Sequence, residues 1–276
     1  MEDLEKKLLE EHWIGPNELI KAKEDKETIK KSIFASLLRL GYISDIELFM
    51  FFGELSSIPF VTIQDYVIDK DILRFLPEEF CRDNLVIPLF KVDSTLFIAM
   101  ANPFDTEIIN SIGNITGLEV NPLIASPKDI LKFLDDNFGF PSNFFNIEKF
   151  IFPLSKLNNF PHHRESGRIP LNLPLEFKVI DDRVRLVSQQ NIPATTFDIS
   201  CNGKALGIKT FIFIPPTVQL LLNFSLNIGV VQAKGEVAYS RMEKGGRFNM
   251  GVKFLDIDDT VISYLLDLAE ENGGYK

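Results

Sequence analysis

The first 55 residues contain a pattern of hydrophobic and polar positions that occurs twice, with an offset of 29 residues. Each copy has paired leucines, an aromatic residue before isoleucine, and a Glu-Leu pair: Leu8-Leu9, Trp13-Ile14 and Glu18-Leu19, then Leu37-Leu38, Tyr42-Ile43 and Glu47-Leu48. This spacing indicates a short helix, a turn and a second helix in each copy. Gly15-Pro16-Asn17 and Ser44-Asp45 are typical starts for the second helices. The sequence therefore predicts a helical duplication over residues 1–55.

Residues 56–138 change to a mixed pattern of strands and helices. Five segments carry it, in the order strand, strand, helix, strand, helix: 86–91, 95–101, near 105–115, near 118–124 and near 127–137. Short apolar runs around the turn at Val92-Asp93-Ser94 predict the first two strands, and a period of 3.6 predicts the helices. We expect a small α/β subdomain here.

The last third of the chain alternates apolar and polar residues, which is the period of a half-buried strand. The alternation runs through Leu171, Leu173, Leu175, Phe177 and Val179, and again through Phe248, Met250, Val252 and Phe254. Gly251 leaves the opposite face of the second segment open. Residues 259–272 have a helical stripe instead, made by Ile262, Leu265, Leu266 and Ala269. The fold class is therefore α+β, with strands grouped at the C-terminal end.

Length and composition suit two domains, because 276 residues of which 45% are hydrophobic supply two cores. No apolar run reaches about 18 residues and no signal-peptide pattern follows Met1, so we expect a cytoplasmic protein without membrane insertion. The net charge of −10 lies almost entirely in residues 1–160, which argues against nucleic acid as a partner. Cys81 and Cys201 are too far apart to indicate a disulfide framework or a zinc site.

A polar cluster, Arg164-Glu-Ser-Gly-Arg168, precedes the first alternating segment. Pro161, Gly167 and Pro170 disfavour a continuous helix around it, so we expect the two arginines on a flexible, exposed arm. Guanidinium groups form forked hydrogen bonds with phosphate oxygens or the acceptor edge of guanine, and they stack on purines. An arm with two of them can wrap around one small ligand.

A second cluster, Asp198-Ile-Ser200-Cys-Asn-Gly203, follows on the other side of the predicted strand. If Phe197 and Ile199 face the core, Asp198 and Ser200 share the opposite face. A carboxylate suits the N1 and N2 donors of guanine, and a serine hydroxyl with backbone amides suits phosphate. Asn202-Gly203 supplies a turn where the backbone can approach a ligand.

Together the two clusters predict a pocket for a guanine-bearing dianion. The alternative interpretation is that the arginines are solvated surface charges and that Asp198 caps a turn. His162 and His163 precede the first arginine, but neighbouring side chains of an extended arm point apart, and His12 is the only other histidine. We therefore expect no metal site.

At these residues the chain resembles the PilZ domain, a bacterial receptor for cyclic di-GMP. That family carries R-x-x-x-R on an N-terminal arm and [D/N]-x-S-x-x-G on the adjoining barrel. The matching residues, which the resemblance implies as the ligand-binding set, are Arg164, Arg168, Asp198, Ser200 and Gly203. Auxiliary contacts are expected from His163, Asn202 and Gly251. The resemblance covers roughly residues 161–272 and implies a six-stranded antiparallel β-barrel with a C-terminal helix. Histidine before the first arginine leaves open whether one ligand or an intercalated pair binds.

The N-terminal part resembles the MshEN domain of type II secretion and type IV pilus assembly ATPases, over roughly residues 1–138. The resemblance rests on the helical duplication and on three segments: Leu85-Val-Ile-Pro-Leu-Phe, Ala99-Met-Ala-Asn-Pro and Pro122-Leu-Ile-Ala-Ser-Pro. Some members bind cyclic di-GMP through two motifs that open with Arg-Leu-Gly and close on Gln. Here the corresponding positions hold Asp3-Leu4-Glu5 and Ser32-Ile33-Phe34, then Lys26 and Leu55. We expect no second nucleotide site.

The sequence predicts three parts: an MshEN-like domain at 1–138, divided at 55/56, a Phe-rich linker at 139–161 and a PilZ domain at 162–276. The linker either packs onto its own domains or offers a patch to a partner. No phosphate-binding loop is present, since Gly203-Lys204 lacks the upstream glycine and the following Ser or Thr, and no nucleophile lies in a recognisable catalytic setting.

We therefore expect a non-enzymatic receptor without a cofactor. It would bind cyclic di-GMP through the PilZ domain and relay binding to a protein partner through the MshEN-like domain. The partner would belong to pilus, secretion or motility control. The alternative is a nucleotide-independent adaptor, or a regulator of a type II secretion or type IV pilus assembly ATPase.

Overall fold

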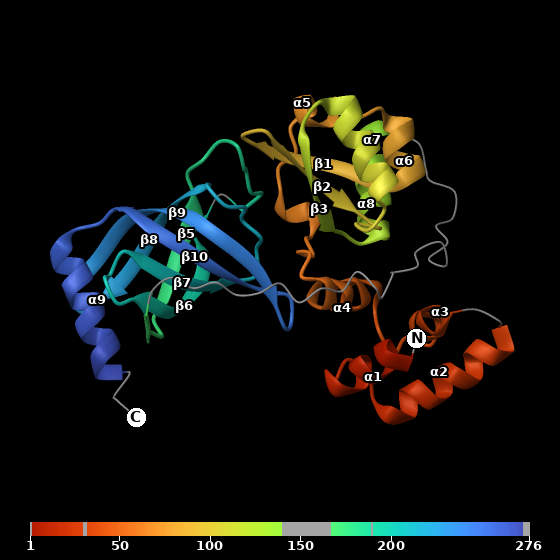
Figure 1. Cartoon of the computed structure of the whole chain (residues 1–276), viewed down its shortest axis with the longest axis horizontal. Helices are drawn as coiled ribbons and strands as arrows, with labels where there is room; N and C mark the ends of the chain where they lie inside the picture. Colours follow the sequence, from red (N-terminus) through yellow and green to blue (C-terminus); the bar gives the residue numbers. More distant parts are fainter. Residues whose placement is uncertain (1, 30–31, 140–166, 189, 273–276) are drawn as a thin grey trace.

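The computed structural model describes residues 2–29, 32–139, 167–188 and 190–272 in three parts (Figure 1). We call them the helical duplication (residues 2–57), the α/β part (58–139) and the barrel (167–272). Arg164, His163 and the predicted Phe-rich linker, apart from Gly139, lie outside the described residues. Within the described ranges, no helix combines the length and the apolar composition needed to cross a membrane.

Four helices form the predicted helical duplication: α1 (Glu2–Glu10), α2 (Pro16–Ile29), α3 (Ile33–Arg39) and α4 (Asp45–Ser56). Equivalent residues of the two copies play equivalent roles. Leu8 and Leu37 are both fully buried. At the start of α2 Glu18 accepts a hydrogen bond from the Gly15 amide (2.7 Å), and at the start of α4 Glu47 accepts one from the Ser44 amide (2.8 Å). The glutamate repeat is thus a helix-capping repeat.

The α/β part contains a three-stranded sheet with helices packed on it. Its elements are η1 (Ile63–Asp65), α5 (Lys70–Leu73), α6 (Glu78–Asn84), β1 (Val86–Val92), β2 (Thr95–Met100), α7 (Thr106–Thr116), β3 (Glu119–Ile124) and α8 (Pro127–Phe138). Strands β1 and β2 form an antiparallel hairpin, and β3 runs parallel to β2 after the α7 crossover. All five predicted segments are confirmed to within a residue or two at their ends.

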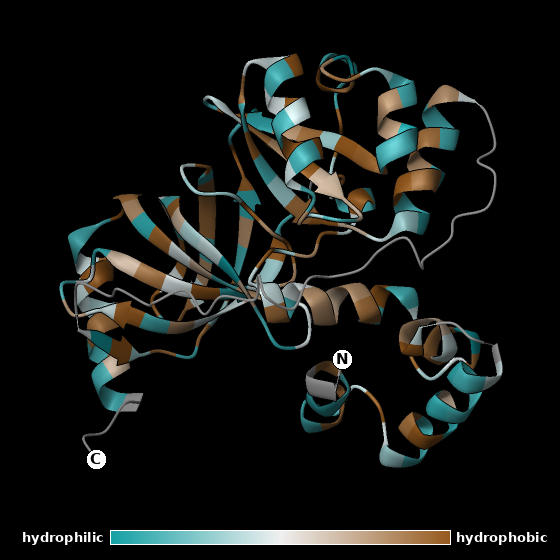
Figure 2. Cartoon of the chain, turned by 45° about the vertical axis from the view of Figure 1, so that its right-hand side comes forward, coloured by the Kyte–Doolittle hydropathy of each residue, from teal (hydrophilic) through white to brown (hydrophobic). Residues whose placement is uncertain are grey.

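Seven strands and one helix form the C-terminal part: β4 (Arg168–Pro170), β5 (Pro174–Val179), β6 (Ile192–Ser200), β7 (Ala205–Thr210), β8 (Gln219–Leu226), β9 (Gly229–Glu243), β10 (Arg247–Asp256) and α9 (Asp259–Asn272). The strand order β5-β8-β9-β10-β7-β6 closes on itself because β6 pairs with both β5 and β7. All of these pairings are antiparallel, and hydrophobic and hydrophilic bands alternate along the strands (Figure 2). The predicted six-stranded antiparallel barrel is confirmed, and β4 adds a short strand beside the end of β6.

The alternating segment 171–179 is not one continuous strand, which corrects the prediction. Pairing of β5 begins at Pro174, and residues 171–173 leave the ladder. The buried Thr196 side chain replaces the missing ladder bonds. Its hydroxyl donates to the Leu171 carbonyl (2.6 Å) and accepts from the Leu173 amide (2.8 Å). Pro174 within the segment and Pro170 just before it lack a backbone donor, so a side chain must satisfy what remains.

Helix α9 packs across β4 and β6, on the side of the barrel away from the α/β part (Figure 1). Leu265 and Ala269 of the predicted stripe are fully buried, and Ile262 and Leu266 are half-buried. The stripe therefore does face the barrel. Because α9 lies over the second polar cluster, it contributes to the surroundings of that cluster.

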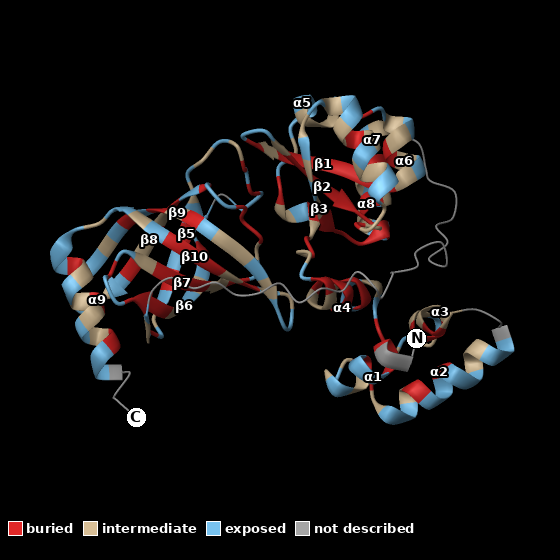
Figure 3. Cartoon of the chain, viewed as in Figure 1, coloured by how far each residue is buried: buried red, intermediate tan, exposed pale blue. Residues whose placement is uncertain are grey.

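The barrel contacts the α/β part through residues 65–67, a segment which we call the strap. Tyr66 forms an antiparallel bridge with Leu186, and the Val67 amide donates to the Arg185 carbonyl (2.8 Å). The Tyr66 hydroxyl donates to the Phe213 carbonyl (2.8 Å), and burial raises its pKa well above the usual value. The apolar residues of both parts form one continuous buried cluster, which appears red on both sides of the strap in Figure 3.

The hairpin between β9 and β10 reaches the helical duplication. At its tip the Gly245 amide donates to Glu54 Oε1 on α4 (2.7 Å), and Gly245 and Gly246 both have positive φ. Burial raises the pKa of Glu54, and hydrogen bonds from the Gly245 and Gly246 amides offset part of this increase. Met242 packs against this continuous cluster and also against a second buried cluster, which is made mainly of residues of the helical duplication. Its Sδ accepts a hydrogen bond from the Phe60 amide (3.2 Å).

Candidate functional site

Arg168 and Asp198 lie together at the edge where β4 pairs with β6. Arg168 is opposite Ser200 in the ladder, and Asp198 is opposite Pro170. Arg168 Nη1 donates to Asp198 Oδ1 (3.2 Å) and to the Ala205 carbonyl (3.4 Å). The two side chains are only 20% and 10% exposed. The prediction of a flexible arm is therefore wrong for Arg168. This residue lies in β4, and the strand fixes its side chain against the Asp198 carboxylate.

Ser200, Asn202 and Gly203 form the expected turn between β6 and β7. Ser200 Oγ donates to Asn202 Oδ1 (2.7 Å) and accepts from the Ala205 amide (2.9 Å). Asn202 Oδ1 also accepts from the Lys204 amide (3.1 Å). Ser200 is almost fully buried, and its hydroxyl supports the turn. This β6–β7 turn fixes the end of β6, where Asp198 lies.

Gly203 is required by the packing of α9. Its φ is +67°, a conformation that favours glycine, and a Cβ built there would lie 2.2 Å from Ile262 Cγ2. The sequence interpretation gave this glycine a role in ligand approach. The structure adds a second reason for it, which holds without any ligand.

Phe197 does not face the core, in contrast to the prediction. A bulge between Thr196 and Asp198 in the pairing of β6 with β7 shifts the alternation by one residue. Ile199 stays fully buried, but the Phe197 ring lies on the same side as the Asp198 carboxylate. Both groups lie within 2.5 Å of the position that a Cβ of Gly207 would occupy. The bulge thus brings an aromatic ring next to the carboxylate.

A row of four paired residues crosses the outer surface of the barrel from Asp198. Asp198 pairs with Gly207, Gly207 with Gly251, and Gly251 with Tyr239. Directly paired residues share one face of a sheet, so Gly207, Gly251 and Tyr239 lie on the same outward face as Asp198. Gly251 does not leave this face open, as expected from the sequence, because the Tyr239 ring covers it. A Cβ at Gly251 would lie 2.2 Å from that ring.

Two cationic side chains lie over the Phe197 and Tyr239 rings. Lys209 Nζ is 5.7 Å from the centroid of Phe197, and the Arg241 guanidinium is 5.2 Å from the centroid of Tyr239. Cations near aromatic faces are attracted by the ring quadrupole. The surface beside Asp198 is therefore aromatic, with a cationic side chain over each ring.

Sequence reasoning missed Phe197 as a surface residue, and it missed Gly207, Lys209, Tyr239 and Arg241. A glycine within a strand signals a close approach, but only the strand pairing tells which ring approaches it. Of the predicted residues, the structure brings together Arg168, Asp198, Ser200, Asn202 and Gly203, and it places Gly251 two strands away from Asp198. Arg164 and His163 lie outside the described residues, so their part in the site stays a prediction.

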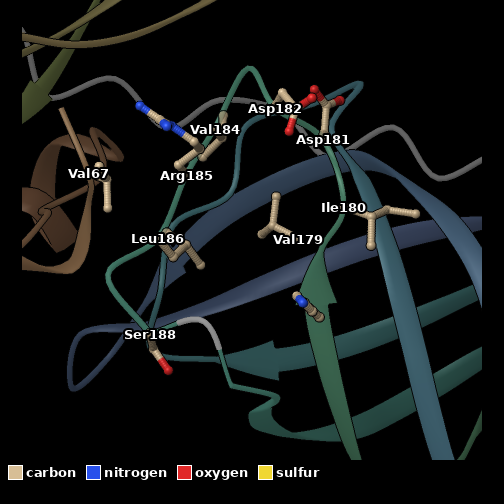
Figure 4. Close-up of a pocket in the computed structure, with 10 residues that line it drawn as sticks. Val67, Val179, Ile180, Asp181, Asp182, Val184, Arg185, Leu186 and Ser188 are labelled. Carbon is tan, nitrogen blue, oxygen red and sulfur yellow. The ribbon is translucent and has the colours of Figure 1, made fainter. Parts of the chain in front are cut away.

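A separate cavity of about 490 Å³ lies between the strap and the loop after β5 (Figure 4). Val67 contributes from the α/β part, and Ile180, Arg185 and Leu186 contribute from the barrel. None of the motif residues lines it. Asp181 at its rim has a pKa below the usual range, because hydrogen bonds from Arg183 stabilise the carboxylate. Among the described residues, no group of three or more His, Cys, Asp or Glu side chains is arranged to hold a metal ion.

Comparisons with known families agree with this architecture. Residues 56–143 match the family described as the MshEN domain, and residues 162–271 match the family described as the PilZ domain. The chain therefore carries an MshEN domain followed by a PilZ domain.

Individual relatives are distant. The type IV pilus assembly ATPase PilB of Myxococcus xanthus (strain DK1622) is 24% identical over 128 residues, which cover 46% of this chain and 23% of the ATPase. The chain thus spans less than a quarter of that relative. A structure of MshE with cdg has 24% identity and a TM-score of 0.42, covering 48% of this chain and 96% of that chain. YcgR in complex with c-di-GMP from Escherichia coli has 15% identity and a TM-score of 0.29, covering 40% and 45%.

Proposed function

We propose that this protein is a non-enzymatic receptor for cyclic di-GMP, which binds at the β4–β6 edge of the PilZ domain. The observation that carries the proposal is the fixed pair of Arg168 and Asp198 beside the turn that starts at Ser200. Both hydrogen bonds from Arg168 to described residues use Nη1. Its Nε and Nη2 donors make no such bond, and they suit phosphate or guanine acceptors. PilZ and MshEN are binding or regulatory domains, which supports a receptor rather than an enzyme.

Titration calorimetry of the full chain with cyclic di-GMP tests the site. Charge-assisted hydrogen bonds contribute about 1.5–3 kcal/mol each, so Arg168→Ala and Asp198→Ala should each weaken binding by roughly tenfold or more. Arg164→Ala tests the predicted second arginine in the same way. Arg247→Ala is the matched control, because Arg247 is an exposed arginine on the same barrel, near the Phe211 ring. Wild-type affinity in the Arg168 and Asp198 variants would reject the site.

We further propose that binding is relayed to the helical duplication by the β9–β10 hairpin. These two strands carry Tyr239 and Gly251 of the outward row, and their tip contacts Glu54 on α4 and pairs Lys244 with Glu11 of α1's C-terminal turn. A displacement of either strand at the row therefore acts directly on the N-terminal helices. The output would be a contact of the MshEN domain with a protein of pilus, secretion or motility control.

Trp13 offers a specific readout of this relay. It is the only tryptophan of the chain and packs edge-on against Phe51 of the helical duplication, with ring centroids 6.0 Å apart. Cyclic di-GMP should change its fluorescence, and Asp198→Ala should abolish the change. Binding by calorimetry without any change in Trp13 emission would refute the relay and leave the receptor proposal intact.

A second candidate function is a nucleotide-independent adaptor or a regulator of an assembly ATPase. One observation favours it: Arg168, Asp198, Ser200 and Asn202 hydrogen-bond to one another or to the turn, so the chain itself supplies partners for these side chains. The similarity to the pilus ATPase directs the search for the partner. Pull-down of a type IV pilus assembly ATPase that is equally efficient with and without cyclic di-GMP would favour this function over the receptor.

A further inference from the structure

Two aromatic rings lie side by side over two neighbouring glycines on the outer face of the barrel. The Phe197 ring covers Gly207, and the Tyr239 ring covers Gly251. The glycines are directly paired in adjacent strands, so the two rings occupy adjoining places. Glycine at both positions allows the rings to approach the backbone closely. The result is an aromatic surface that begins at Asp198 and extends across β7 and β10.

A cation accompanies each of the two rings, namely Lys209 on Phe197 and Arg241 on Tyr239. A further cation–π contact, Arg247 on Phe211, lies beyond the end of β7 and outside this surface. The Arg241 side chain is exposed, and its guanidinium lies 5.2 Å from the Tyr239 centroid. A ring with a guanidinium above it is a site where a purine can stack on either or between them.

The two places adjoin each other on the barrel surface. The Asp198 carboxylate and the Phe197 ring lie at Gly207, and the Tyr239 ring lies at the directly paired Gly251, one strand spacing of about 4.8 Å away. A guanine that hydrogen-bonds to Asp198 therefore leaves the Tyr239 ring to the other base of a dinucleotide. Lys209 lies over the Phe197 ring, on the strand next to Asp198, and suits a bridging phosphate.

Arg241 lies over the face of the Tyr239 ring, so it is placed to stack on a base there. Asn249 is paired with both Lys209 and Arg241 across the strands, and it is a candidate to read the edge of that base. However, its amide nitrogen donates to Glu243, and its Oδ1 is buried without a hydrogen-bond partner. Stacking without edge contacts tolerates any purine.

We propose that the Tyr239–Arg241 pair holds the second purine of the cyclic dinucleotide by stacking alone, so that only the base at Asp198 is recognised as guanine. The proposal rests on the proposed function above and extends it to specificity. It assigns Tyr239 and Arg241 to ligand contact, and it makes recognition of the two bases unequal.

The test compares three ligands by calorimetry on the full chain: cyclic di-GMP, 3′,3′-cyclic GMP–AMP and cyclic di-AMP. The mixed ligand should bind the wild type within about threefold of cyclic di-GMP, and cyclic di-AMP should bind at least tenfold more weakly, since a site that hydrogen-bonds one base rejects its analogue. Mixed-ligand binding as weak as that of cyclic di-AMP would overturn the proposal.

Variants locate the stack. Tyr239→Leu keeps bulk over Gly251 but removes the aromatic face, and it should weaken cyclic di-GMP roughly tenfold, whereas Tyr239→Phe should bind normally. Arg241→Ala changes an exposed side chain and should weaken binding roughly threefold or more. Phe211→Leu, which removes a similar ring–arginine pair outside this surface, is the control and should bind as the wild type does.

The outcomes separate this inference from the proposed function. Wild-type binding that is lost in Asp198→Ala but unchanged in Tyr239→Leu and Arg241→Ala would overturn the second stacking place alone. A wild type that does not bind cyclic di-GMP at all would overturn the receptor itself.

Discussion

Replacing Gly203 with alanine adds one methyl group where the structure leaves no room for it. The new Cβ would lie 2.2 Å from Ile262 Cγ2 and 3.4 Å from Leu266 Cδ1, whereas carbon atoms in contact are normally about 3.5–4.0 Å apart. Helix α9 or the turn must therefore move by more than about 1 Å, because 2.2 Å is that much shorter than a normal carbon–carbon contact. Overpacking of this kind costs about 1–3 kcal/mol. The positive φ adds about 1–2 kcal/mol for a non-glycine residue.

Gly203→Ala should therefore destabilise the protein by about 2–5 kcal/mol, a large part of the stability of an ordinary domain. Urea unfolding followed by far-ultraviolet circular dichroism measures this. Tryptophan fluorescence is the wrong probe for the barrel, since Trp13 lies in the helical duplication.

Ile262→Ala separates the two contributions. In that background the steric conflict with α9 disappears, while the backbone strain stays, so Gly203→Ala should cost only about 1–2 kcal/mol more. An equal cost of Gly203→Ala in both backgrounds would refute the packing argument. So would an unchanged stability combined with weaker nucleotide binding, which would show that the glycine serves the ligand.

Three further predictions concern other parts of the chain. Thr196→Val should cost about 2–3 kcal/mol in urea unfolding, because a buried amide and a buried carbonyl of the segment before β5 lose their partner, whereas Thr196→Ser should cost much less. Hydrogen bonds from Arg183 hold the pKa of Asp181 below its usual value, so the stabilisation by this carboxylate is present above about pH 4 and is lost as the pH falls through the lowered pKa. In Asp181→Asn, the free energy of unfolding measured at acidic pH should therefore depend less on pH. Burial raises the pKa of Cys81 to about 12, so maleimide should label the folded protein once, at the exposed Cys201, and twice after unfolding; rapid double labelling of the native protein would contradict the burial.

Local periodicity was sufficient to predict the elements whose residues contact one another within one segment. The helical duplication followed from leucines such as Leu8 and Leu37, which occupy the same position in each copy and are both fully buried. The stripe around Leu265 likewise predicted α9. These patterns record which side of an element is buried, and burial is the main determinant of their sequence.

The site was predicted less completely because it depends on pairings between distant strands. Arg168 is fixed by a three-residue strand whose partner lies about 30 residues away, and a segment that short has no period of its own. The bulge before Asp198 shifts Phe197 outward, although strict alternation assigns it to the core. Gly251 looked like an open position because its cover, Tyr239, comes from another strand. The sequence identified the motif residues, and the register determined what lies beside them.

The shared core across the Tyr66 strap has a consequence for how this protein unfolds and how it can be divided. The match to the PilZ family begins at residue 162. However, Phe213 of the barrel packs against Phe97 of the α/β part, with ring centroids 6.2 Å apart, and its carbonyl accepts a hydrogen bond from the Tyr66 hydroxyl. A barrel cut out at the family boundary would expose this apolar surface to water, and the α/β part would lose the acceptor of a buried phenol. Heating should therefore melt the two together in one calorimetric transition. The segment that is inherited as a module is smaller than the segment that folds as one body.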